Sequence, residues 1–222
     1  MKNVRSLTLA LAAATVIGMP LLAWVIMSFL PDFDYPAYFI SEEPILWQIA
    51  AGLLYGTIAA FLAQGIISLK FMKKLTFRYA EMIGSMNLNT NDIIFISFCA
   101  GFGEEVLFRG VIQPHLGILA SSIIFVALHG YISFVNWRMS VYGAFMTLVI
   151  IGIGYLVEWG GLIPAIIAHT IIDVILLLFI NQKLKKIREN AGNTKYNEMM
   201  TSEVGFEDES SSVIDNKDIE NH

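Results

Sequence analysis

Six stretches of this chain are long and apolar enough to cross a membrane as helices, and they limit its fold more than any other feature. A helix needs about 20 predominantly apolar residues to span a hydrocarbon layer of about 30 Å. Only 15% of the residues are charged, compared with about 25% in an average soluble domain, so lipid must solvate much of the surface. The sequence predicts an all-α, polytopic membrane protein with about six transmembrane helices, at approximately 7–30, 45–69, 92–113, 116–135, 139–157 and 161–180.

The basic residues lie on one side of these predicted spans. Lys2 and Arg5 precede the first span, a cluster at 70–78 follows the second, and another cluster begins at Lys183 after the sixth. The loop 31–44 contains acids and no lysine or arginine. By the positive-inside rule, both termini are expected in the cytoplasm. Cysteine labelling of the 70–78 cluster from the outer side would contradict this topology.

Two segments are expected outside the bilayer core. In 70–83, apolar residues recur at helical spacing between basic ones, which predicts a short helix lying in the interface. We expect a transmembrane domain at 1–183 and a polar, acidic, disordered tail at 184–222. After residue 200 the chain has seven acids and one lysine, whereas the rest has 13 basic and 12 acidic residues. No basic face therefore remains for a nucleic acid.

Ionisable residues inside the predicted spans mark the candidate site, because each costs several kcal/mol in a membrane unless it is paired or hydrated. Counted at about 1.5 Å per residue from the predicted span starts, four of them lie roughly 10–20 Å below the outer boundary, near the midplane. We therefore expect these four side chains, which come from three helices, to share one cavity. They are Glu104, His129, His169 and Asp173.

Spacing within the third span indicates different roles for the two adjacent acids, Glu104 and Glu105. Glu105 and Arg109 are four residues apart in the favourable orientation for an ion pair. Glu104 is rotated by about 100° from Glu105 and is free of that pair. A carboxylate in a low-dielectric cavity suits a general base near neutral pH, so Glu104 is the candidate base.

Three short motifs occur in order on these spans. Glu104–Arg109 fits EExxxR, Phe125–His129 fits FxxxH, and His169–Asp173 fits HxxxN/D. Together they resemble the CAAX protease and bacteriocin-processing (CPBP, or Abi) family of intramembrane proteases, which includes the type II CAAX prenyl endopeptidases. The resemblance covers roughly residues 90–180.

The resemblance implies an endopeptidase in a prokaryotic cell membrane, with membrane lipid and a membrane-associated or prenylated peptide or protein as partners. Glu104 and His129 would activate the attacking water. Glu105 and Arg109 would hold the third helix in register.

In the same resemblance, His169 and Asp173 would stabilise the tetrahedral oxyanion. The prenyl endopeptidases typically have Asn where this chain has Asp173, and an anionic carboxylate would serve poorly there. Glu104, His129 and His169 could instead form a zinc site with an open position. The chain contains no HExxH motif, and the same groups could polarise water without a metal.

Two other classes of function are compatible with ionisable residues inside the spans. One is a membrane scaffold or bacteriocin self-immunity protein that keeps the fold without proteolysis. The other is a proton or ion pathway, which would need polar residues that continue to both membrane faces. The spans above and below the cluster are almost wholly apolar, which favours an enclosed hydrolytic cavity.

Overall fold

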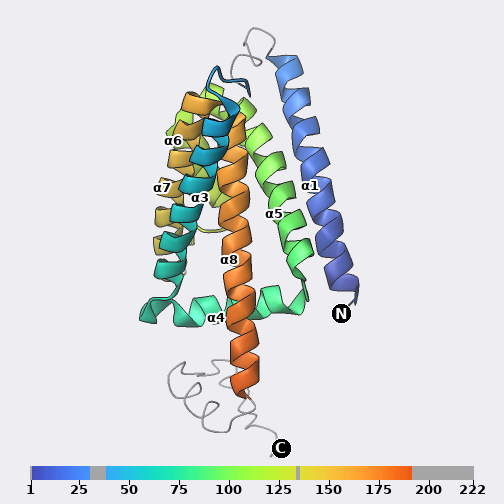
Figure 1. The fold of residues 1–222 in the computed structure, drawn as a ribbon, viewed down its shortest axis with the longest axis vertical. Coiled ribbons are helices and arrows are strands. Elements are labelled where there is room, and N and C mark those ends of the chain that lie inside the picture. Colours follow the sequence, from blue (N-terminus) through green and yellow to red (C-terminus); the bar gives the residue numbers. More distant parts are fainter. Residues whose placement is uncertain (1, 31–38, 134–135, 192–222) are drawn as a thin grey trace, which may run out of the picture. The chain divides into compact units, whose positions relative to one another are not determined.

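The computed structural model describes residues 2–30, 39–133 and 136–191 (Figure 1). The chain divides into two units, Met1–Lys185 and Lys186–His222, and the second is described only as far as Ala191. The tail predicted to be disordered at 184–222 is helical as far as Ala191, where α8 ends, and the rest of it lies outside the described residues, as does the segment 31–38. The helices are α1 (Lys2–Phe29), α3 (Ile45–Ile67), η1 (Lys70–Met72), α4 (Lys73–Ser85), α5 (Thr90–Leu107), the π-helix η2 (Phe108–Ile112), α6 (Gln113–Leu128), α7 (Trp137–Gly160) and α8 (Leu162–Ala191).

Five helical segments are long and apolar enough to cross a membrane. They are Val4–Phe29, Ile45–Ile67, Thr90–Leu128, Trp137–Gly160 and Leu162–Lys186. Large apolar side chains such as Leu54 and Leu148 point outward from them, as expected of surfaces that face lipid. The described residues contain no strand, so the predicted all-α, polytopic membrane fold is confirmed.

The predicted third and fourth spans lie in one helical segment that is broken at Gly117. This glycine has φ 77° and ψ 166°, which no helix can accommodate. Past the break the chain folds back, as the distance of 4.9 Å between the ring centroids of Phe108 and Phe125 shows. In a continuous helix these two residues would be about 25 Å apart. A sharp reversal at Gly117 therefore separates the two predicted spans.

Helix α6 ends earlier than the predicted span 116–135. Its helical part after the break, 118–128, rises about 17 Å, roughly half of a membrane crossing. Gly130, with φ 73°, ends the helix in a left-handed turn, in which the N–H groups of Gly130 and Tyr131 donate to carbonyls of the last turn. The helix end places His129 at the cavity, where its side chain is 32% exposed.

The ends of several elements meet near α4. Figure 1 shows α4 lying across the long helices, at the end where α1 begins. Arg5 in α1 forms a bidentate ion pair with Asp92 in α5, with N···O distances of 2.7 and 2.9 Å. Asn181 in α8 donates to the carbonyl of Leu88, just before α5. This arrangement agrees with basic clusters on one side, and the cytoplasmic location of that side remains a prediction.

Two glycines in α5 allow the close helix approach that positions the site. A Cβ atom on Gly101 would collide with Thr170 of α8, and one on Gly103 would lie 2.6 Å from the carbonyl oxygen of Thr15 in α1. Helix α5 is therefore held between α1 and α8 at the level of the acidic pair that follows these glycines.

Gly117→Ala is expected to lower the thermal unfolding midpoint in detergent, because φ 77° with ψ 166° is a conformation that costs a residue with a Cβ about 1–3 kcal/mol. Gly65→Ala is the matched control, since Gly65 lies within α3 and nothing is within 4 Å of an added Cβ. This control should leave the midpoint unchanged or raise it. Equal midpoints for the two variants would contradict the reversal at Gly117.

Candidate active site

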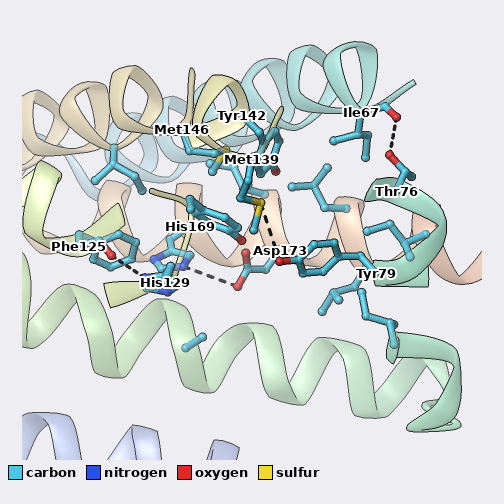
Figure 2. A pocket seen from close by; sticks show the side chains of 18 of the residues that line it. Ile67, Thr76, Tyr79, Phe125, His129, Met139, Tyr142, Met146, His169 and Asp173 are labelled. Carbon is cyan, nitrogen blue, oxygen red and sulfur yellow. Dashed lines mark hydrogen bonds and ion pairs between the residues drawn. The ribbon is translucent and has the colours of Figure 1, made fainter. Parts of the chain in front are cut away.

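The four residues predicted to share a cavity lie together in the structure. Glu104 is in the last turn of α5, His129 caps the end of α6, and His169 and Asp173 occupy successive turns of α8. All four line one cavity of about 290 Å³, and Figure 2 shows His129, His169 and Asp173 in it. The reversal at Gly117 and the early end of α6 are what bring His129 to the other three.

Glu104 lies between two imidazoles. Its Oε2 atom is 3.3 Å from Nε2 of His129 and 3.9 Å from Nε2 of His169. This oxygen is buried and has no hydrogen-bond partner among the described residues. Native proteins rarely leave a buried polar atom unsatisfied, so such an atom in a cavity is a candidate for direct contact with a substrate or a water molecule.

The orientation of His129 is fixed from its own helix. Its Nδ1 atom is 2.8 Å from the carbonyl oxygen of Phe125, so the Nδ1–H donates there and Nε2 faces Glu104. The Phe125 ring stacks on the imidazole at a centroid distance of 4.3 Å. The FxxxH spacing thus places both the ring and the carbonyl that hold His129, since residues four apart lie on the same face of a helix.

His169 is held by the second acid of the pair. Its Nδ1 atom is 2.7 Å from Oε1 of Glu105, and its Nε2 atom is 3.6 Å from Oδ2 of Asp173. Nδ1–H therefore donates to Glu105, and Nε2 is directed into the cavity between Glu104 and Asp173. A carboxylate on the far nitrogen of a histidine fixes the tautomer and the ring orientation.

Glu105 also pairs with Arg109, as the sequence spacing predicted. Arg109 Nε lies 3.2 Å from Glu105 Oε2, and both side chains are fully buried. The guanidinium also donates to Gln113 Oε1 at 3.0 Å, to Ser121 Oγ at 3.2 Å and to the Ile150 carbonyl at 3.3 Å. These contacts join η2 to α6 and α7, so the buried charges are supported from three elements.

Sequence reasoning missed the contact between Glu105 and His169 and the polar partners of Arg109. Gln113 lies four residues after Arg109, a spacing that could have indicated it. The contacts to Ser121 and His169 join residues 12 and 64 positions apart, and no local pattern predicts them.

The three residues suggested as zinc ligands lie close to each other, at distances that only partly match those of a zinc site. A tetrahedral zinc with ligands at about 2.1 Å brings donor atoms to about 3.4 Å from each other. The distance from Glu104 to His129 matches this value, but the 3.9 Å to His169 exceeds it. In the described part of the chain, no group of three His, Cys, Asp or Glu residues is placed to hold a metal ion.

The part of the chain that contains the four site residues is similar to a known protein family. Residues 87–175 match the model of the family described as type II CAAX prenyl endopeptidase Rce1-like. The predicted family resemblance is confirmed for this segment. At the level of the family, the match supports a protease-type enzyme in a membrane.

One relative aligns with this chain over a segment about as long as the family match. The uncharacterized protein YpbD of Bacillus subtilis (strain 168) is 40% identical over 85 residues, which is 37% of this chain. The alignment spans 42% of that relative, so this chain covers less than half of the relative's length. No solved structure matches the chain.

Proposed function

We propose that this protein is an intramembrane endopeptidase that hydrolyses a peptide bond of a membrane-associated substrate by a glutamate-dependent mechanism. The observation that carries the proposal is the buried Oε2 atom of Glu104, which lacks a hydrogen-bond partner among the described residues and lies between two imidazoles in an apolar cavity. The match of residues 87–175 to the Rce1-like family supports the reaction class.

In the proposed first step, Glu104 and His129 activate water. A water molecule beside Glu104 Oε2 and His129 Nε2 can contact both, since these atoms are 3.3 Å apart. Glu104 takes one proton while the water oxygen attacks the carbonyl carbon of the substrate. The C–N bond is intact at this stage, and the carbonyl oxygen carries the negative charge of a tetrahedral intermediate.

In the second step, His169 and Asp173 stabilise the oxyanion. Nε2 of His169 faces the cavity because Nδ1 donates to Glu105, and Nε2 donates a hydrogen bond when the ring carries both protons. Asp173 can donate only in its protonated form. The intermediate collapses when the C–N bond breaks and Glu104 returns its proton to the leaving amine, which gives a free carboxylic acid and an amine.

The apolar cavity supports a membrane-associated substrate. Its titratable acids and imidazoles are the four site residues, and most of the other lining residues are aliphatic, aromatic or methionine. Glu105 is held by Arg109 and His169 and thereby removed from direct chemistry, which leaves Glu104 as the free base.

A membrane-peptide library incubated with the purified protein tests the proposed function. We expect cleavage at defined bonds, one ¹⁸O atom from labelled water in each new carboxylate, and no loss of rate with 1,10-phenanthroline. Mass spectrometry measures the bonds cleaved and the label. Absence of cleavage would overturn the endopeptidase proposal, and loss of cleavage with the chelator would overturn the glutamate-dependent mechanism in favour of a metal-dependent one.

A further inference from the structure

Tyr79 of α4 and Met139 of α7 meet inside the cavity. The Tyr79 hydroxyl donates to Met139 Sδ at 3.8 Å, and both side chains line the cavity. Figure 2 shows Tyr79 reaching from α4 toward Asp173, with Met139 above it. The contact therefore lies where the catalytic end of the cavity meets the aliphatic end near α4, and we call it the Tyr79–Met139 contact.

Both partners are held in place by their own elements. Near Tyr79, Thr76 Oγ1 donates to the carbonyl of Ile67 at 2.7 Å, which fastens α4 to the end of α3. Near Met139, Trp137 stacks on Phe71 of η1 at 5.5 Å with an interplanar angle of 13°. Met139 itself is 6% exposed. The separation between α4 and α7 at this point is thus set by packing on both sides, and a fixed separation can select by size.

The chemistry of the contact indicates selection by size. A thioether is a weak acceptor and 3.8 Å is a long distance, so the hydrogen bond adds little and the restriction comes from the volume of the two packed side chains. The tyrosine ring and the methionine side chain present apolar surfaces. No lysine or arginine lines the cavity among the described residues, and most of the lining side chains are apolar.

We propose that the Tyr79–Met139 contact restricts the substrate residue that flanks the cleaved bond on the α4 side to a small side chain. This inference rests on the proposed peptidase function and adds the residues that determine specificity. Tyr79 and Met139 take no part in bond cleavage. Their effect is confined to which side chain can lie beside Asp173 while the bond is attacked.

The test uses a peptide that the wild-type protein is found to cleave. It is resynthesised with Ala, Val, Leu or Phe on each side of the cleaved bond, and kcat/KM is measured for each form. At one of the two positions the wild type should prefer Ala. Tyr79→Ala should raise the ratio of kcat/KM for Leu or Phe to that for Ala by roughly tenfold or more, the discrimination that a few methylenes give in an apolar pocket.

Three further variants separate selection from general damage. Met139→Ala, on the opposite wall, should relax selectivity at the same substrate position, which keeps the test valid if Tyr79→Ala does not fold. Tyr79→Phe keeps the ring and should keep the wild-type ratio. Tyr155→Ala removes an exposed tyrosine of α7 that does not line the cavity and should also keep it.

Two results would contradict the proposed selection of a small side chain without contradicting the proposed peptidase function. One is a wild type that accepts Phe as well as Ala on both sides of the bond. The other is that both alanine variants lower cleavage of all forms equally. If the wild type cleaves no peptide while Glu104→Gln behaves identically, the proposed function itself fails and this inference fails with it.

Discussion

Glu104→Gln is expected to lower peptide cleavage by about 100-fold or more, the usual contribution of a positioned general base. Glutamine keeps the size of the side chain and cannot take a proton from water. Stability should change little, because Glu104 Oε2 is buried and makes no hydrogen bond with the described residues. The measurements are the cleavage rate and the midpoint of thermal unfolding in detergent, on the same preparations.

Glu158→Gln is the matched control for this change. Glu158 is an exposed carboxylate near the end of α7, outside the cavity, so the same substitution there should leave both rate and midpoint unchanged. Near-wild-type cleavage by Glu104→Gln would contradict its assignment as the base. If no variant cleaves peptide while all retain a biological activity of the protein, a scaffold or immunity role would replace the protease.

Much of the fold follows from properties that act along single helices. The apolar run at 45–69 matches α3 at Ile45–Ile67, and the basic amphipathic run at 70–83 matches η1 and α4. In these segments the length and spacing of the apolar residues suffice to predict a helix, because a segment in a membrane must make its backbone hydrogen bonds within itself. The end of α6 was not anticipated, although Gly130 after His129 is the residue type that ends helices in a left-handed turn.

The candidate site shows the same division between local and distant contacts. Helical spacing predicted the pair of Glu105 with Arg109, and motif order placed the site histidines on different helices. Spacing on one helix gives the face of a residue but not which face of another helix it meets. The sequence therefore predicted different roles for Glu104 and Glu105, but it did not predict the hydrogen bond between Glu105 and His169. That contact requires α5 to lie close to α8 at Gly101.

Glu105→Gln is expected to reduce both stability and activity. It leaves the Arg109 guanidinium without an anion at a site where both side chains are 0% exposed. Breaking a buried pair from one side costs about 3–5 kcal/mol in soluble proteins, so the midpoint of thermal unfolding should fall clearly below that of Glu104→Gln. Cleavage should fall as well, because His169 loses the carboxylate that orients its ring.

The ion pair between Arg5 and Asp92, in which the cation is exposed and the carboxylate is buried, provides a comparison for burial. Arg5 is 42% exposed and its guanidinium can be hydrated, so Arg5→Gln should lower the midpoint less than Glu105→Gln does, although it too removes one partner of an ion pair. A midpoint for Arg5→Gln as low as that of Glu105→Gln would show that burial of the cation does not determine how much stability is lost when its ion pair is broken.

The double variant Glu105→Gln/Arg109→Met identifies the source of the loss in stability. Removing the second charge abolishes the unpaired guanidinium, so the double variant should lose less stability than the sum of the two single variants. Its cleavage should stay low, because His169 still lacks the Glu105 carboxylate. If the losses in stability add fully, the two side chains act independently and the pair does not stabilise the site. If the double variant regains cleavage, Glu105 has no role in orienting His169.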